Sequence, residues 1–132
     1  MDMAEIEERF ETIEECYEFM LAYAAQGHAS DQSSESGRRV REFLNRAACA
    51  LNGLAECCAA AMGDNGLAFL AVLERDASDS LAALDLVLAQ PAISSQLIDN
   101  LNASVHVRAL LTDIFLLGEI LRAQRVAEAA AF

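Results

Sequence analysis

His106 and Asp113 are the first candidates for chemistry, because both are titratable and both fall in the apolar face of a predicted helix. At about 100° per residue they lie beside the line formed by Val107, Leu110 and Ile114. We therefore predict that both side chains are buried and hydrogen-bonded. They are seven residues apart, about 10.5 Å along a helix, so each needs another partner. A buried titratable pair marks either a binding site or a structural contact across a helix interface, and we favour the structural interpretation.

The first predicted helix carries glutamates along one flank of its apolar seam, and two of them could turn inward as metal ligands. Ferritin-like di-iron bundles combine glutamates from two helices with Glu-x-x-His motifs from two others. The chain contains no Glu-x-x-His, which favours a solvated acidic face over a metal site. If a carboxylate and histidine site exists, its candidate ligands are Glu7, Glu14, His106 and Asp113.

Other reactive residues lack the spacing that catalysis or metal binding requires. The four cysteines are free of any Cys-x-x-Cys pattern and fall inside predicted helices, so we expect reduced thiols that pack as small apolar groups. The sequence has neither a glycine-rich phosphate loop nor a Gly-x-Ser-x-Gly elbow. We therefore expect no cofactor. A phosphotransfer bundle that uses His28 or His106 is the weakest alternative.

The formal charge of −12 disfavours two classes of partner. A strongly acidic protein is repelled by nucleic-acid phosphates and by anionic lipid headgroups. The N-terminus shows no secretory signal, and the most apolar window, 109–121, is interrupted by acids and too short for a bilayer. We expect a cytoplasmic protein. Nine arginines with no lysine, together with abundant alanine, favour a bacterial source.

Apolar residues recur at alternating spacings of three and four, which is the pattern of helices that pack along one seam. This pattern predicts helices over 4–26, 38–62, 66–89 and 95–127. Residues 28–37 form a polar loop, a break is conceivable in the polar stretch 76–80, and 128–132 is an apolar tail. The sequence thus predicts an all-α protein, a single domain over 1–132 with an antiparallel four-helix bundle.

Three apolar side chains fall outside the predicted seams, which indicates a surface for a partner. They are Phe19, Leu101 and Phe115. The first twenty residues hold eight acids and one arginine, whereas the start of the second helix holds four arginines, so these patches could meet within one chain or between two. We predict a non-enzymatic accessory or adaptor protein that acts by protein contact as a homodimer. The alternative is a ligand- or metal-binding bundle around His106 and Asp113.

Overall fold

The computed structural model describes residues 3–32 and 34–130, and within these ranges it contains helices and no strand. The prediction of an all-α fold is confirmed. The described residues form six α-helices and one short 3-10 helix, rather than the four helices predicted. They are α1 Met3–Ala25, α2 Glu35–Leu51, α3 Leu54–Met62, η1 Asp64–Gly66, α4 Leu67–Leu88, α5 Ser95–Ala103 and α6 Val105–Ala130.

Two of the four predicted helices are each divided in two. The first break lies at Gly53, whose φ of +73° is a left-handed conformation that glycine adopts at little cost. Arg9 donates hydrogen bonds to the carbonyls of Ala50 and Asn52, at 3.2 and 2.6 Å, where α2 ends. The second break lies at Ser104, which leaves the helical conformation and donates its backbone N–H to the carbonyl of Leu101. No break occurs in 76–80, because α4 continues through it.

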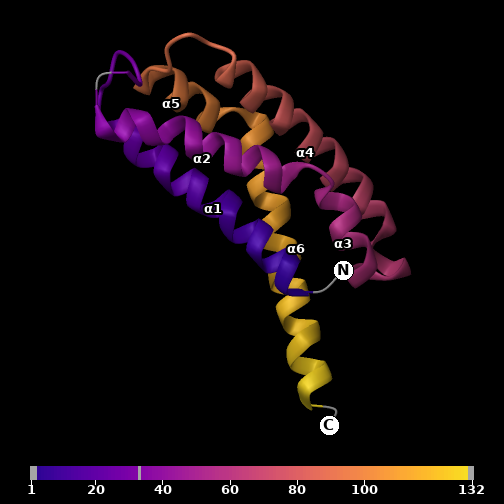
Figure 1. Ribbon diagram of the computed structural model, residues 1–132. Coiled ribbons are helices and arrows are strands. Elements are labelled where there is room, and N and C mark those ends of the chain that lie inside the picture. The colour runs from indigo at the N-terminus through magenta and orange to yellow at the C-terminus, as the bar shows by residue number, and fades with distance from the viewer. Residues whose placement is uncertain (1–2, 33, 131–132) are drawn as a thin grey trace.

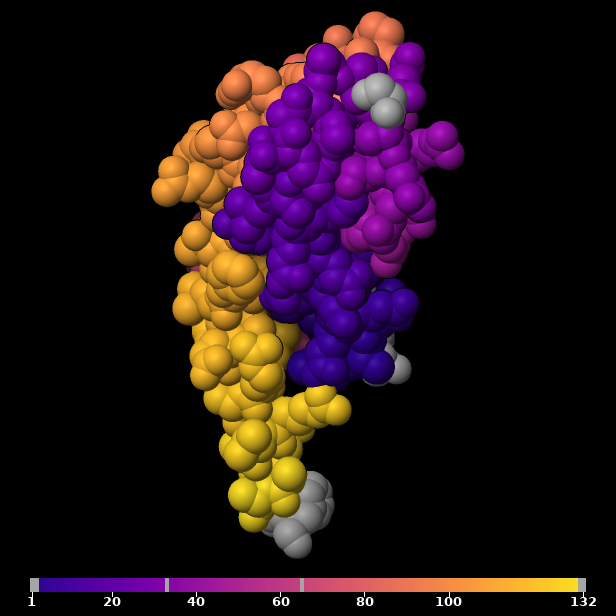
Figure 2. Space-filling view, turned by 90° about the vertical axis from the view of Figure 1, so that its left-hand side faces the viewer, coloured from indigo at the N-terminus to yellow at the C-terminus, as the bar shows by residue number. Residues whose placement is uncertain are grey.

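All six α-helices contribute to one hydrophobic core. Helix α1 packs mainly against α2 and α5, and α4 packs against α2, α3 and α6 (Figure 1). The C-terminal part of α6 extends beyond the other helices (Figures 1 and 2). Residues 122–130 of this helix are all exposed. The predicted apolar tail is therefore helical as far as Ala130, and residues 131–132 lie outside the described residues.

The segment between α1 and α2 is fixed to the segment between α4 and α5 by a buried hydrogen-bond network. The Nε of Arg41 donates to Asp31 Oδ2 at 2.7 Å, and the N–H of Ile93 donates to Asp31 Oδ1 at 2.8 Å. Tyr23 donates its hydroxyl to the carbonyl of Ile93 at 2.6 Å, and the Oγ of Ser95 donates to the carbonyl of Tyr23 at 2.6 Å. The predicted polar loop 28–37 thus anchors two connections. Helix α2 begins at Glu35, three residues earlier than predicted and inside the range predicted for the loop.

Candidate functional site

Asp113 is buried as predicted, with 5% of its surface exposed, and it lies where α6 meets α4. Its side chain interacts with that of Asp76 on α4, and a hydrogen bond between the two carboxyls requires a proton on one of them. In the described part of the chain no hydrogen-bond donor reaches Asp113 Oδ2. Burial, followed by the hydrogen bond to Asp76 and the charge of Asp76, raises the pKa of Asp113 to about 7. The raised pKa favours the protonated form of Asp113 at this contact.

The prediction that His106 is buried is wrong, because its side chain is exposed. It lies in the first turn of α6, directly after the break at Ser104, and there its backbone carbonyl accepts the hydroxyl of Ser80 at 2.9 Å. On the wheel of α6 His106 lies about 20° from the buried Asp113, but it is in the first turn, where that side of the helix is exposed. His106 and Asp113 therefore have different environments and do not form one site.

The glutamates proposed as metal ligands lie on a different side of α6 from Asp113. Glu7 is exposed and pairs with Arg125, and Glu14 lines a groove between α1 and α6. Among the described residues, no three histidine, cysteine, aspartate or glutamate side chains converge as metal ligands. Glu7 and Glu14 line the same groove, whereas His106 and Asp113 lie elsewhere, so the four residues do not form one site.

The cysteine thiols are free, and three of the four are buried. Burial raises the pKa of Cys16 and of Cys58 to about 12, which keeps both as neutral thiols at neutral pH. Cys49 on α2 is exposed.

Two of the three side chains predicted to face a partner are covered within the chain. Leu101 is only 6% exposed and belongs to the core, because it lies in the separate helix α5 rather than on the outer face of a longer helix. Phe19 stacks on Phe43 of α2 with ring centroids 4.3 Å apart, and the guanidinium of Arg39 lies 5.8 Å from its ring centroid. Only Phe115, 52% exposed, lies on the surface as predicted.

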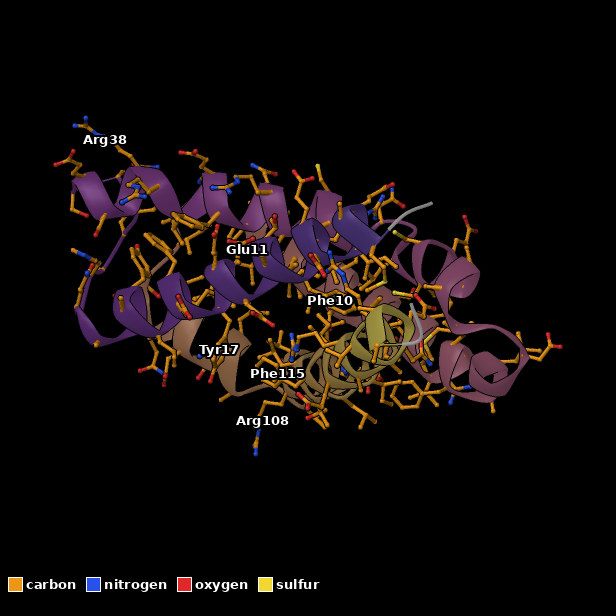
Figure 3. The ribbon with its side chains drawn as sticks, turned by 90° about the horizontal axis from the view of Figure 1, so that it is seen from below. Phe10, Glu11, Tyr17, Arg38, Arg108 and Phe115 are labelled. Atoms are coloured by element: carbon orange, nitrogen blue, oxygen red, sulfur yellow. The ribbon has the colours of Figure 1, made fainter. Side chains whose placement is uncertain are left out.

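The acidic N-terminal patch and the arginines of α2 meet in part within one chain. Arg46 lies 3.5 Å from Glu15 of α1, and Arg41 is engaged with Asp31. The remaining arginines near the start of α2 point outward or cover aromatic rings, and Figure 3 shows Arg38 directed away from the helices. The two patches are thus partly neutralised within one chain, and this does not require a second chain.

Helix α6 carries a second apolar line that the sequence analysis did not identify, on the side away from the core. Its members recur every three or four residues and are exposed, except Ala109, which is half-buried. Val105 is 71% exposed and Leu116 is 48% exposed. We call this line the α6 outer stripe. It consists of the apolar residues Val105, Ala109, Leu116, Ile120, Ala123 and Ala127 together with Thr112.

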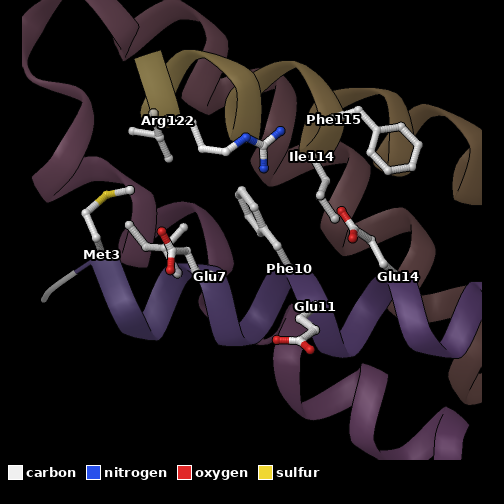
Figure 4. A pocket seen from close by; sticks show the side chains of 11 residues that line it. Met3, Glu7, Phe10, Glu11, Glu14, Ile114, Phe115 and Arg122 are labelled. Carbon is white, nitrogen blue, oxygen red and sulfur yellow. The ribbon is translucent and has the colours of Figure 1, made fainter. Parts of the chain in front are cut away.

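A groove of about 350 Å³, the α1–α6 groove, lies on another face of α6. Figure 4 shows Phe10 pointing into it from α1 and Arg122 reaching over it from α6. Three glutamates of α1 and an apolar floor complete the lining. The lining residues are Met3, Ile6, Glu7, Phe10, Glu11, Glu14, Ile114, Phe115, Gly118, Leu121 and Arg122.

None of the helices in the described ranges has both the length and the apolar character that a membrane crossing requires. Comparison with protein-family models, with curated proteins and with solved structures finds no match to this chain.

Proposed function

We propose that this chain is a non-enzymatic accessory protein that acts through protein contact and associates with a second copy of itself. The observation that carries the proposal is the α6 outer stripe. Monomeric proteins seldom leave a continuous apolar line of this length in water, since burying it is favourable. A second copy of α6 would cover it with the same residues, as two-fold symmetric dimers do.

The charge of α6 supports a second copy as the occupant of the stripe. Helix α6 contains three arginines and three acidic residues, whereas α1 contains seven acidic residues and one arginine. Two chains that each carry a net charge of −12 repel one another, and the repulsion is smallest where both present a neutral helix. The hydroxyl of Thr112 donates to the carbonyl of Arg108 at 2.9 Å, so its hydrogen bond is met within α6.

The projecting end of α6 supports the same conclusion. Residues 122–130 are helical although all are exposed, and Arg125 joins them to the rest of the chain through its ion pair with Glu7. This end of a 26-residue helix has no core contacts to stabilise it. A partner helix that runs along the outer stripe would stabilise this end as well.

Light scattering over a range of protein concentrations, combined with a Leu116→Glu variant, tests the proposal. We expect the wild type to reach the mass of two chains and Leu116→Glu to remain a monomer with unchanged helix content by circular dichroism. Ala123→Arg, a change at an exposed position, should act in the same way. The matched control is Leu86→Glu on α4, where the leucine is 67% exposed and lies outside the stripe.

Two results would contradict the dimer. One is a monomeric mass for the wild type at every concentration and salt concentration tested. The other is a Leu116→Glu variant that dimerises as well as Leu86→Glu. A Phe115→Glu variant adds information about the edge of the contact, since Phe115 lies between the outer stripe and the α1–α6 groove.

A further inference from the structure

Gly118 lies in the middle of α6 and lines the α1–α6 groove, although packing does not require a glycine there. A Cβ added at this position would lie 3.5 Å from the nearest atom outside the local backbone, the Nη1 of Arg122, which is an ordinary van der Waals distance. Glycine inside a helix costs about 1 kcal/mol relative to alanine. Gly118 therefore makes α6 less stable than alanine would, and the missing side chain leaves the groove open.

The carboxylates at the edge of the groove are not all neutralised by the chain's own cations. Glu7 pairs with Arg125, but Glu11 and Glu14 have no ion pair or hydrogen bond from their side chains within the described residues. Partial burial raises the pKa of Glu14, while the charge of Arg122 opposes that shift. The groove thus combines an apolar floor formed by Phe10 and Ile114 with two carboxylates that make no ion pair within the described residues, although the charge of Arg122 acts on Glu14.

We propose that the α1–α6 groove binds an amphipathic helix of a partner protein, one that carries aliphatic side chains flanked by arginine or lysine. This inference rests on the proposed function, in that the chain acts by protein contact. It adds the place of the contact and the chemistry of the partner. The aliphatic side chains lie on Phe10 and Ile114, and the cations lie against Glu11 and Glu14.

The shape of the groove favours a helix as the occupant. Its lining on α1 runs from Met3 to Glu14, about 16 Å along the helix axis, which equals about three turns of a docked helix. A volume of about 350 Å³ over that length accepts a single row of side chains. Such a row is what an amphipathic helix presents at spacings of three and four residues. The absence of a side chain at Gly118 lets the backbone of the docked helix approach α6 closely.

The test uses a fluorescently labelled helical peptide of leucine and lysine, about 18 residues long, with leucine on one face. Binding is followed by fluorescence anisotropy at 0.15 M salt or above, where the general attraction of an acidic protein for a cationic peptide is screened beyond about 8 Å. The control peptide has the same composition in an order that destroys the apolar face. We expect the amphipathic peptide to bind and the control peptide to bind at least about tenfold more weakly.

Variants of the protein locate the binding site. Gly118→Leu fills the groove, is compatible with the helix and should reduce affinity by at least about tenfold while the melting temperature is kept or raised. The double variant Glu11→Gln/Glu14→Gln should weaken binding about fivefold to tenfold, because two partly exposed ion pairs are lost. The matched control is Glu8→Gln/Glu42→Gln, which removes two exposed carboxylates outside the groove and should change affinity less than twofold.

Several outcomes would overturn the inference. Unchanged affinity in Gly118→Leu shows that the peptide does not enter the groove, and Gly118→Ala repeats this test with a smaller side chain if the leucine disturbs folding. Equal weakening by the two double variants shows general electrostatic attraction. If Gly118→Leu is monomeric while Leu116→Glu stays dimeric, the groove is occupied by a second copy of this chain and not by a partner helix. All binding is also measured on Leu116→Glu, so that a failure of the dimer and a failure of the groove are distinguishable.

Discussion

The strongest prediction for stability concerns Arg41, which joins α2 to two connecting segments. Its Nε donates to Asp31 Oδ2 at 2.7 Å, its Nη1 to the carbonyl of Leu88 at 2.9 Å and its Nη2 to the carbonyl of Gln90 at 2.8 Å. Replacing Arg41 with alanine removes all three hydrogen bonds. It also leaves the carboxylate of Asp31, whose side chain is 6% exposed, with the N–H of Ile93 as its remaining donor outside its own loop.

The magnitude follows from the burial of the two partners. Removing one partner of a fully buried ion pair costs about 3–5 kcal/mol, and a hydrogen bond to a charged group contributes about 1.5–3 kcal/mol. Because the side chain of Arg41 is 33% exposed, water can replace part of what is lost. We therefore expect Arg41→Ala to lower the free energy of unfolding by about 3 kcal/mol. For a chain of 132 residues this equals a fall in melting temperature of about 10 °C.

Thermal melts followed by circular dichroism measure this change, with Arg38→Ala as the control. Arg38 is exposed, lies on the same helix and is without an ion pair in the described part of the chain, so its removal should alter the melting temperature by less than about 2 °C. Equal melting temperatures for the two variants would refute the assignment of Arg41 as an anchor.

The same variant has a pH signature. Burial disfavours ionisation of Asp31, but the hydrogen bonds from Arg41 and Ile93 and the charge of Arg41 outweigh it, and the pKa of Asp31 falls below 3.8. A lowered pKa means that the ionised carboxylate stabilises the fold at neutral pH, and that this stability is lost as the pH falls below 3.8. The stability difference between wild type and Arg41→Ala should therefore narrow in acid.

Three further predictions concern other parts of the molecule. The pKa of Asp113 is raised to about 7, so the stability provided by its protonated form is lost as the pH rises through 7. At pH 8–9 we therefore expect Asp113→Asn to have a higher melting temperature than wild type and a free energy of unfolding that is larger by about 1–2 kcal/mol. This prediction would be contradicted if the free energy of unfolding changed with pH to the same extent in the two proteins. Cys49, the exposed thiol, should be alkylated first in the folded protein, giving a single rapid adduct by mass spectrometry that Cys49→Ser abolishes. Leu116→Glu should be monomeric and still bind the peptide, whereas Gly118→Leu should be dimeric and bind the peptide weakly. A variant that loses both dimer formation and peptide binding would show that the two surfaces depend on each other.

Helices with an uninterrupted apolar repeat could be predicted closely from the sequence. The spacing along α1 and α4 fixed both ends within two residues, because the start of each seam, Gly27 and Pro91 are strong local signals. The break between α2 and α3 was missed, although Asn52-Gly53 is a dipeptide typical of turns. There the seam continues in register on both sides, and apolar periodicity alone does not detect a change in helix direction.

One missed break explains one error about the candidate site, and the end of a helix explains another. A helix wheel is valid only while the axis continues, and Ser104 ends one helix and precedes the next. Leu101 was placed outward on a wheel that spans this break, and the structure buries it. His106 lies after the break, in the same helix as Asp113 and about 20° from it on the wheel, but it is in the first turn of α6, where that side of the helix is exposed. Asp113 lies nine residues beyond Ser104, well inside α6, and its burial was predicted correctly.

Contacts between segments that are distant in the chain could not be predicted from the sequence. Asp31 lies in a polar loop with no pattern of its own, and its partners Arg41 and Ile93 are identified only when two loops meet. A glycine inside an apolar helix is a visible signal, but the groove it leaves open depends on where α1 crosses α6. The outer stripe could also be read from the spacing of Leu116, Ile120 and Ala123. It was missed because the core seam of the same helix already accounted for an apolar repeat.

The two contacts proposed for helix α6 are compatible with each other because the surfaces concerned are separated around its axis. At about 100° per residue, Gly118 points about 160° away from Leu116, so the groove and the outer stripe lie on nearly opposite sides. The core seam through Leu110, Ile114 and Leu117 lies on the side of the groove and fixes the helix to the rest of the fold. A dimer formed along the stripe would therefore leave both α1–α6 grooves open to solvent. Two partner helices could then be held by one dimer, which is how an accessory protein without chemistry of its own would bring two molecules together.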